Sequence, residues 1–556
     1  MPIYYTNNGE LFAWYKEDTI KKFRSKISSE LIKTYGKGPF DEKRIVEILF
    51  FTLDLYQNDF LKILQNETEL AFYQNLFLLH EFSSKIHQEK LNESYQGVIN
   101  DKEFAIYRRI LKLCLEQACD LKLNYNVEGS SEYLKSKEDV IDCLLYLGDH
   151  IYSYSNLLAS QDLINDSVDL KFTPDDQFYF DFKHHYGYLI TEVSKSYPDH
   201  IAEAVVGDDD FNDFVTALNS CLGIDYGAVV DTIKRIHEHL PGGKFTLDEP
   251  FIYPKNLENL YGIPFQHGET FFKGLTLNKD NKMSLKEAVY RPHNTTKYLY
   301  RPFLIWNVDG KDLTIVGDKI FIESIHSLCT NAFGWNKYPI EWENECFKKY
   351  IQSKVSKNDK ILEDKAEKLL QENNVIYDRN LKYLKKWNHR NLNIDNDLCG
   401  EIDFLFIHNK SIYIADSKHL IARYDMNNFK NDSAYFERNK KAYNKTIKRK
   451  MNFLKANISD VQEHFQVKLN DKNLKIEDCT IEAIFIVNTP TFIMYNNEFR
   501  IYTLKSFREL LENTFIDQEY SLLIDEENNQ KFLNVKYPYF QKPIYKVFDI
   551  KDYEDE

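Results

Sequence analysis

Residues 400–418 read GEIDFLFIHNKSIYIADSK, and this stretch predicts two adjacent strands. Residues 400–407 and 411–417 each combine β-branched and aromatic side chains, which are typical of strands. The polar residues 408–410 between them suit a short connection. The stretch therefore predicts a β-hairpin.

The sequence around this hairpin predicts an α/β domain. Apolar residues recur every three or four positions before and after the hairpin, which indicates amphipathic helices, and two further apolar runs indicate buried strands. Such an order predicts a sheet with helices packed on its faces. The expected elements are helices at 361–372, 437–455 and 505–511 and strands at 481–487 and 499–504.

The predicted hairpin brings acidic residues and a lysine together. Side chains alternate across a strand, so residues two apart share a face. Glu401 and Asp403 therefore share a face of the first strand, and Asp416 and Lys418 share a face of the second. Whether Glu401 joins a metal shell or is simply an acid at a strand start stays open.

The helix before the hairpin offers a further carboxylate. Glu363 and Glu367 flank the apolar stripe of residues 361–372, one turn apart. Either can reach one side of the helix, and Glu363 is the favoured candidate. Because Mg²⁺ prefers oxygen ligands, Glu363, Asp403 and Asp416 form the expected metal site.

Lys418 has an expected catalytic role beside these acids. An ammonium group can orient a water molecule and offset charge that grows on a phosphorus centre during hydrolysis. The competing interpretation is that Asp416 and Lys418 form an exposed ion pair at a sheet edge, which would contribute little.

Together these residues resemble the PD-(D/E)XK nuclease superfamily, also called restriction-endonuclease-like. Its pattern is a Glu on a helix, an Asp on the first hairpin strand and an acid-x-Lys on the second, matched here by Leu362-Glu363, residues 400–403 and residues 414–418. The resemblance extends over about residues 341–520. It implies a mixed central sheet flanked by helices and hydrolysis of nucleic-acid phosphodiesters with Mg²⁺, for which Mn²⁺ can substitute. It also implies metal ligation by Asp403 and Asp416 and catalysis by Lys418.

Two positions depart from the superfamily pattern. Ile402 stands where the name of the superfamily has proline, and Asp416 stands where glutamate is more frequent. A catalytically inactive nuclease fold that binds nucleic acid or a partner is therefore the alternative prediction. A third is a partner-binding protein that uses its aromatic-rich helices as an interface.

A basic segment follows the hairpin. Residues 437–455 contain eight Lys or Arg residues and one acid. Lys441, Lys445 and Lys448 share one flank of the expected helix, and together with Lys440 they are expected to contact a phosphate backbone. The alternative is a solvated helix face that only favours solubility. The expected buried stripe of this helix consists of Tyr443, Ile447, Met451 and Leu454.

Composition limits the class of protein. The chain has 556 residues, 43% of them hydrophobic, and a net charge of -15, which argues against a disordered chain and a polybasic protein. Its eight cysteines are scattered without a C-x-x-C pair, which argues against a disulfide framework or a zinc knuckle. No signal peptide or long apolar run is evident, so we expect a cytoplasmic protein without a membrane partner.

The chain divides into three expected regions within a multidomain α+β fold. Residues 1–240 have helical spacing, as in Ile45-Ile48-Leu49, residues 241–340 read as a mixed α/β connection with an Asp309-Gly310 hairpin turn, and residues 341–556 form the nuclease-like domain. By analogy with similar nucleases we expect an anti-phage or restriction-like role, with DNA favoured over RNA. A homo-oligomer, and a protein or phage-derived trigger for the helical half, belong to the same expectation.

Overall fold

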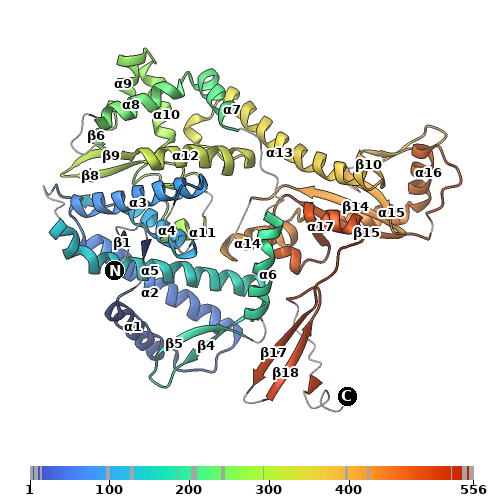
Figure 1. Ribbon diagram of the computed structural model, residues 1–556, viewed down its shortest axis with the longest axis horizontal. Helices are drawn as coiled ribbons and strands as arrows, with labels where there is room; N and C mark the ends of the chain where they lie inside the picture. Colours follow the sequence, from blue (N-terminus) through green and yellow to red (C-terminus); the bar gives the residue numbers. More distant parts are fainter. Residues whose placement is uncertain are drawn as a thin grey trace. The chain divides into compact units, whose positions relative to one another are not determined.

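A computed structural model shows a mixed α/β protein with two compact units (Figure 1). The first unit comprises residues 1–158, 170–179 and 208–355, and the second comprises residues 159–169, 180–207 and 356–556. The structure describes residues 4–5, 11–12, 15–95, 101–125, 131–183, 186–201, 210–238, 245–291, 294–394, 399–421, 426–476, 478–526, 529–540 and 548–549.

Helices predominate in the first unit. In α2 (Glu42–Asn66), Asp41 caps the helix by accepting a hydrogen bond from Arg44 N at 2.8 Å, and the predicted stripe Ile45-Ile48-Leu49 is fully buried. The other helices and helical turns of this unit are α1 (Glu17–Tyr35), α3 (Leu70–Leu91), α4 (Asp101–Ala118), α7 (Asp210–Ala217), η1 (Leu218–Leu222), α8 (Tyr226–Glu238), α9 (Ile252–Tyr261), α10 (Phe265–Gly274), α11 (Leu285–Tyr290), α12 (Asp318–Asn331), η2 (Phe333–Trp335) and η3 (Ile340–Trp342).

A small sheet lies within the first unit, in the order β3-β8-β9-β6, with β7 paired to β8. The predicted turn joins β8 to β9, and the positive φ angles of Asp309 (49°) and Gly310 (82°) match a two-residue hairpin turn. The strands of this unit are β1 (Tyr4–Tyr5), β2 (Leu11–Phe12), β3 (Lys122–Leu123), β6 (Phe245–Asp248), β7 (Thr276–Leu277), β8 (Phe303–Val308) and β9 (Lys311–Gly317).

Sheet pairing joins two of the predicted regions. β3, from the predicted helical region 1–240, pairs in parallel with β8, from the predicted connection 241–340. The predicted boundary at residue 240 itself lies outside the described residues. The two regions belong to one unit because backbone hydrogen bonds of a single sheet hold them together.

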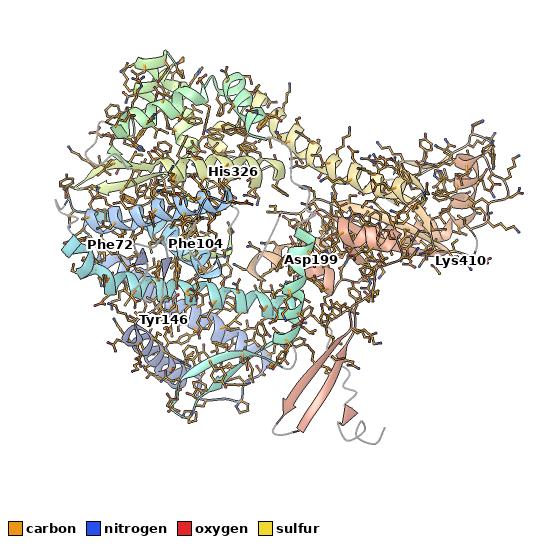
Figure 2. The ribbon with its side chains drawn as sticks, in the orientation of Figure 1. Phe72, Phe104, Tyr146, Asp199, His326 and Lys410 are labelled. Carbon is orange, nitrogen blue, oxygen red and sulfur yellow. A yellow bond between two sulfur atoms is a disulfide. The ribbon has the colours of Figure 1, made fainter. Side chains whose placement is uncertain are left out.

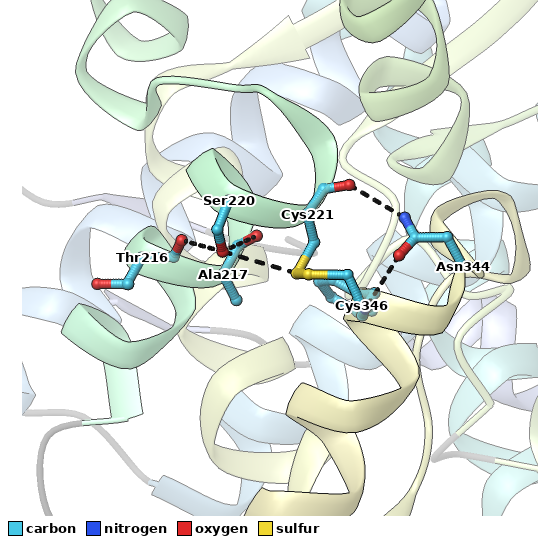
Figure 3. Close-up of a disulfide and its surroundings, with 7 residues drawn as sticks. Thr216, Ala217, Ser220, Cys221, Asn344 and Cys346 are labelled. Atoms are coloured by element: carbon cyan, nitrogen blue, oxygen red, sulfur yellow. Dashed lines mark hydrogen bonds between the residues drawn. A yellow bond between two sulfur atoms is a disulfide. The ribbon is translucent and has the colours of Figure 1, made fainter.

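A disulfide bond also crosses the first unit. Cys221 in η1 and Cys346 at the start of α13 (Glu345–Glu372) are joined, with Cα atoms 5.3 Å apart (Figure 3). Asn344 supports the junction by donating a hydrogen bond from Nδ2 to Cys221 O at 3.1 Å. The sequence argument against a disulfide framework did not anticipate this bond, because 125 residues separate the two cysteines.

The second unit is built around a five-stranded mixed sheet, in the order β10-β13-β14-β15-β16. β10, β13 and β14 are antiparallel neighbours, whereas β15 and β16 run parallel to β14. The elements of this unit are α6 (Tyr186–Ile201), β10 (Ile376–Leu381), β11 (Tyr383–Leu384), β12 (Leu392–Asn393), β13 (Ile402–His408), β14 (Ser411–Lys418), α14 (Met426–Ser433), η4 (Ala434–Arg438), α15 (Tyr443–Ala456), α16 (Ile458–Leu469), β15 (Thr480–Val487), η5 (Phe492–Tyr495), β16 (Arg500–Thr503), α17 (Leu504–Leu511), β17 (Tyr520–Glu526), β18 (Asn529–Val535) and β19 (Phe548–Asp549). Residues of α5 (Ser131–Leu163), β4 (Val168–Phe172), β5 (Phe178–Phe182) and α13 belong to both units.

The predicted hairpin is confirmed as β13 and β14 at the middle of this sheet. Asn409 and Lys410 form its two-residue turn, both with positive φ, and Lys410 is labelled in Figure 2. The predicted strands 481–487 and 499–504 and the predicted helix 505–511 also form, each within one residue of its expected bounds.

Helices cover both faces of the sheet, as alternation of side chains requires. On one face Tyr413 and Ala415 of β14 pack with α13 and α17. On the other face Ile412 and Ile414 pack with α14, α15 and α16. Residues of β14 therefore belong alternately to two separate cores. No helix in the described part of the chain combines the length and the apolar character needed to cross a membrane.

Reduction of the disulfide is expected to destabilise the first unit. Closing a loop of 125 residues restricts the unfolded chain, which corresponds to about 5 kcal/mol in the chain-entropy treatment. Urea unfolding with and without a thiol reductant measures this loss, and Cys221→Ser should reproduce it without reductant. The control is Cys479→Ser, because Cys479 is a free cysteine. Equal unfolding midpoints for oxidised and reduced protein would contradict the expectation.

Candidate functional site

Asp416 and Lys418 lie at the C-terminal end of β14, on the face that α15 covers. They are two and four residues beyond Ile414, which packs with α15, so alternation turns their side chains the same way. Asp403, near the start of the neighbouring strand β13, accepts a hydrogen bond at Oδ2 from Ser417 N at 2.7 Å. The structure thus brings the three predicted catalytic residues together.

Asp416 is the buried centre of this group, with 1% of its surface exposed. Its Oδ1 accepts a hydrogen bond from Lys450 Nζ at 2.7 Å, and its Oδ2 lies 3.5 Å from Lys418 Nζ. Lys418 Nζ also lies 5.2 Å from the centre of the Tyr443 ring, a cation–π contact. Two lysines therefore surround one buried carboxylate.

The charges of the group act on each other strongly. Burial and the negative charge of Asp416 raise the pKa of Asp403 to about 6. Burial disfavours ionisation of Asp416, but the charges of Lys418 and Lys450 outweigh it and lower the pKa of Asp416. Burial likewise opposes the charge of Lys418, and Asp416 and Asp403 nevertheless raise its pKa. Asp403 is thus the acid whose charge is least compensated.

Lys450 is a site residue that the sequence analysis missed. It is one of the eight basic residues of the segment 437–455, and only 6% of its side chain is exposed. A signal exists in the sequence, because Lys450 is three residues after Ile447 and four before Leu454, both buried. That spacing places Lys450 on the apolar stripe of α15, facing the sheet.

The acids of α13 belong to a different cluster. Arg379 of β10 lies opposite Phe404 of β13, on the face that α13 covers. Its guanidinium bonds Glu363 at 2.8 Å and Glu367 at 2.7 Å. The sequence could not show this clamp, because it depends on which face of the sheet α13 covers.

Glu363 therefore does not join Asp403 and Asp416 as the sequence predicted. α13 packs on the face of Tyr413 and Ala415, whereas Asp416 is on the face of α15. Glu367 is held in the same way as Glu363, and its Oε1 also accepts a hydrogen bond from Tyr377 Oη at 2.9 Å.

Two further acids, Glu401 and Asp359, have different surroundings. Glu401 forms an ion pair with Lys382 at 3.6 Å in which both side chains are well exposed, so its partner is outside the buried group. Asp359, one helical turn before Glu363, was not singled out by the sequence. Desolvation and the charge of Glu363 raise its pKa, while Lys418 acts in the opposite direction. Asp359 thus lies within electrostatic range of Lys418.

The basic segment forms differently from its prediction. α15 begins at Tyr443, so Lys440 and Lys441 lie before the helix, and both are exposed. Lys445 and Lys448 are exposed on the helix, and Lys448 bonds Glu498 at 2.7 Å. A shallow surface hollow on this face is lined by Lys445, Lys448, Arg449, Asn452 and Phe453.

The donor set fits a divalent cation only in part. Within the described ranges, no cluster of three or more His, Cys, Asp or Glu side chains suitable for a metal ion is found. Asp403 and Asp416 nevertheless supply two adjacent carboxylates, the ligands that Mg²⁺ prefers. These two residues fit a cation, whereas Glu363 does not.

Comparisons of the chain with protein-family models, with curated proteins and with solved structures found no match. The functional interpretation therefore depends on the geometry of the site and on the sequence pattern that it carries.

Replacement of Arg379 by glutamine is expected to destabilise the second unit. The change leaves Glu363 and Glu367 without the cation that joins α13 to β10, and loss of charged hydrogen bonds in a partly buried ion pair costs about 1.5–3 kcal/mol. Denaturant unfolding measures the difference. Lys382→Gln is the matched control, because its pair with Glu401 is exposed and should contribute nothing measurable. Equal losses for both variants would contradict the clamp.

Replacement of Asp403 by asparagine is expected to stabilise the ion-free protein above pH 6. An Asp with a folded pKa of about 6 and an unfolded value near 3.9 holds its proton better when folded, so wild-type stability falls as the pH rises from about 4 to 6. The variant lacks this loss, so its free energy of unfolding should exceed that of wild type by about 3 kcal/mol at pH 8, and the difference should vanish near pH 4. Denaturant unfolding in a chelator, repeated from pH 4 to pH 8, measures this difference, with Glu401→Gln as the control. Parallel pH profiles of stability for wild type and Asp403→Asn would contradict the prediction.

Proposed function

We propose that the second unit is a nuclease domain of the PD-(D/E)XK type that hydrolyses phosphodiester bonds, with DNA as the favoured substrate. The observation that carries the proposal is the convergence of Asp403, Asp416 and Lys418 at the ends of two neighbouring strands. The surrounding mixed sheet, with α13 before it and α15 between β14 and β15, supports the proposal, because a mixed sheet flanked by helices is what the sequence resemblance implies.

Asp403 and Asp416 would hold the divalent ion, Mg²⁺ with Mn²⁺ as a substitute. When bound, this ion supplies Lewis-acid polarisation of the phosphate and lowers the pKa of a coordinated water. Lys418 performs the protein's own part of the chemistry. Its ammonium orients the attacking water and offsets negative charge that develops on the phosphate oxygens.

Side chains around the site support binding of a polyanion. Lys440, Lys441 and Lys445 are exposed near the start of α15, the helix that also supplies Lys450 to the site. Phosphate contacts by such residues provide affinity without reading sequence. In a chain of net charge -15, a local basic surface reduces the repulsion of nucleic acid.

The second candidate is a nucleic-acid-binding domain without catalysis. The observation that favours it is the environment of Asp416, whose two carboxylate oxygens already face Lys450 and Lys418. An acid with both oxygens engaged by cations can be purely structural. In this case the basic surface would bind nucleic acid and the acids would take no part in hydrolysis.

Incubation of the full chain with plasmid DNA and with RNA, in chelator, Mg²⁺ or Mn²⁺, distinguishes the two candidates. The nuclease proposal expects ion-dependent cleavage that falls at least about 100-fold in Asp416→Asn and Lys418→Ala, because each removes an electrostatic contribution to the transition state. Lys382→Ala, at the exposed ion pair, should cleave normally. Absence of cleavage under every condition would contradict catalysis, and nucleic-acid binding in chelator would then support the second candidate.

A further inference from the structure

Lys450 differs from every other basic residue discussed for α15, because its charge is buried against the site. Its side chain is 6% exposed, that of Asp416 is 2% exposed, and the atoms Nζ and Oδ1 are 2.7 Å apart. By contrast, Lys448 on the same helix is 53% exposed and bonds an exposed glutamate. An ammonium group leaves water at this depth only when a carboxylate compensates it. Lys450 and Asp416 therefore stabilise each other.

The position of Lys450 restricts what else Asp416 can bind. The carboxylate has two oxygens, and Lys450 holds Oδ1 while Lys418 lies 3.5 Å from Oδ2. A hard divalent cation needs direct contact with a carboxylate oxygen. A cation on Oδ1 would meet the Lys450 ammonium at hydrogen-bond distance from the same atom, where two positive charges repel each other strongly.

Lys418 and Lys450 are therefore not equivalent. Lys418 makes the longer contact with Asp416, and its ammonium also lies over the Tyr443 ring, so it can keep a favourable environment when Asp416 binds a cation. The Lys450 ammonium instead donates its hydrogen bond to Asp416 Oδ1. Of the two lysines, Lys450 is therefore the one that competes most directly with a divalent ion for the charge of Asp416.

We propose that Lys450 is an internal counter-ion that competes with the divalent cation for the Asp416 carboxylate, so that its charge lowers the affinity of the site and ion binding weakens or replaces its contact with Oδ1. This inference rests on the proposed nuclease function. Lys450 is a positioning residue in this role, because it holds the Asp416 carboxylate before the ion binds and sets the affinity of the site. Substrate with its phosphate charge would help the exchange by giving the displaced ammonium a new partner.

The test is Mn²⁺ affinity of the full chain without nucleic acid, measured by calorimetry and by the rise in unfolding temperature on adding Mn²⁺. Lys450→Met removes the competing charge while keeping a side chain of similar length. We expect at least about tenfold tighter Mn²⁺ binding than in wild type, together with a lower unfolding temperature in chelator. The matched control, Lys448→Met on the exposed face of α15, should leave Mn²⁺ affinity unchanged.

Two further variants keep the test decisive. Lys450→Arg retains the charge and should bind Mn²⁺ no more tightly than wild type, a difference that a merely structural role would not produce. If Lys450→Met does not fold, Lys450→Gln replaces it, with the same expectation of tighter binding. Asp416→Asn combined with Lys450→Met should abolish the gain, because the contested carboxylate is gone.

The outcomes separate this inference from the proposed function. Ion-dependent cleavage by wild type with equal Mn²⁺ affinities in wild type and the uncharged variants would overturn the role of Lys450 and leave the nuclease proposal intact. Absence of both cleavage and Mn²⁺ binding in wild type and in every variant would overturn the nuclease proposal, and this inference with it. The inference is supported if Lys450→Met or Lys450→Gln binds Mn²⁺ more tightly than wild type while Lys450→Arg and Lys448→Met do not.

Discussion

The alternation of side chains along β14 is the constraint on which the second unit depends. This strand lies at the middle of the five-stranded sheet and is buried from Ser411 to Asp416, so each of its residues must belong to one of two cores. Tyr413 and Ala415 face α13, whereas Ile412 and Ile414 face α15. Asp416 continues the second series, and its carboxylate therefore enters a face that apolar side chains otherwise fill. A buried acid in that position needs compensating charge.

The two faces of the sheet meet this need with separate ionic clusters. On the α15 face, Lys450 and Lys418 compensate Asp416, whereas burial and the negative charge of Asp416 raise the pKa of Asp403. On the α13 face, Arg379 bonds Glu363 and Glu367 and fastens the helix to β10. The first cluster balances two acids, Asp403 and Asp416, with two lysines, Lys418 and Lys450. The second cluster sets one arginine against two glutamates and stabilises the packing of α13 on β10.

Local elements were predictable because their determinants are local. β-branched and aromatic residues predicted β13 and β14, and the Asp309-Gly310 dipeptide predicted the turn between β8 and β9. Asp403, Asp416 and Lys418 also met as expected, since they lie on neighbouring strands of one hairpin. Glu363 did not join them as predicted, because its position depends on which face of the sheet α13 covers. The Cys221–Cys346 bond escaped prediction for a similar reason, since it joins residues distant in sequence.

The sequence by itself determined the hairpin, the spacing that unites Asp416 with Lys418, and the apolar spacing of Ile447 and Leu454 in α15. Those features depend on periods of two and 3.6 residues within single elements. Only the tertiary structure decided which helix covers which face, and hence that Lys450 bonds Asp416 while Glu363 and Glu367 pair with Arg379. The physical reason is that helix packing is set by long-range burial of apolar side chains, which the periodicity of one element does not encode.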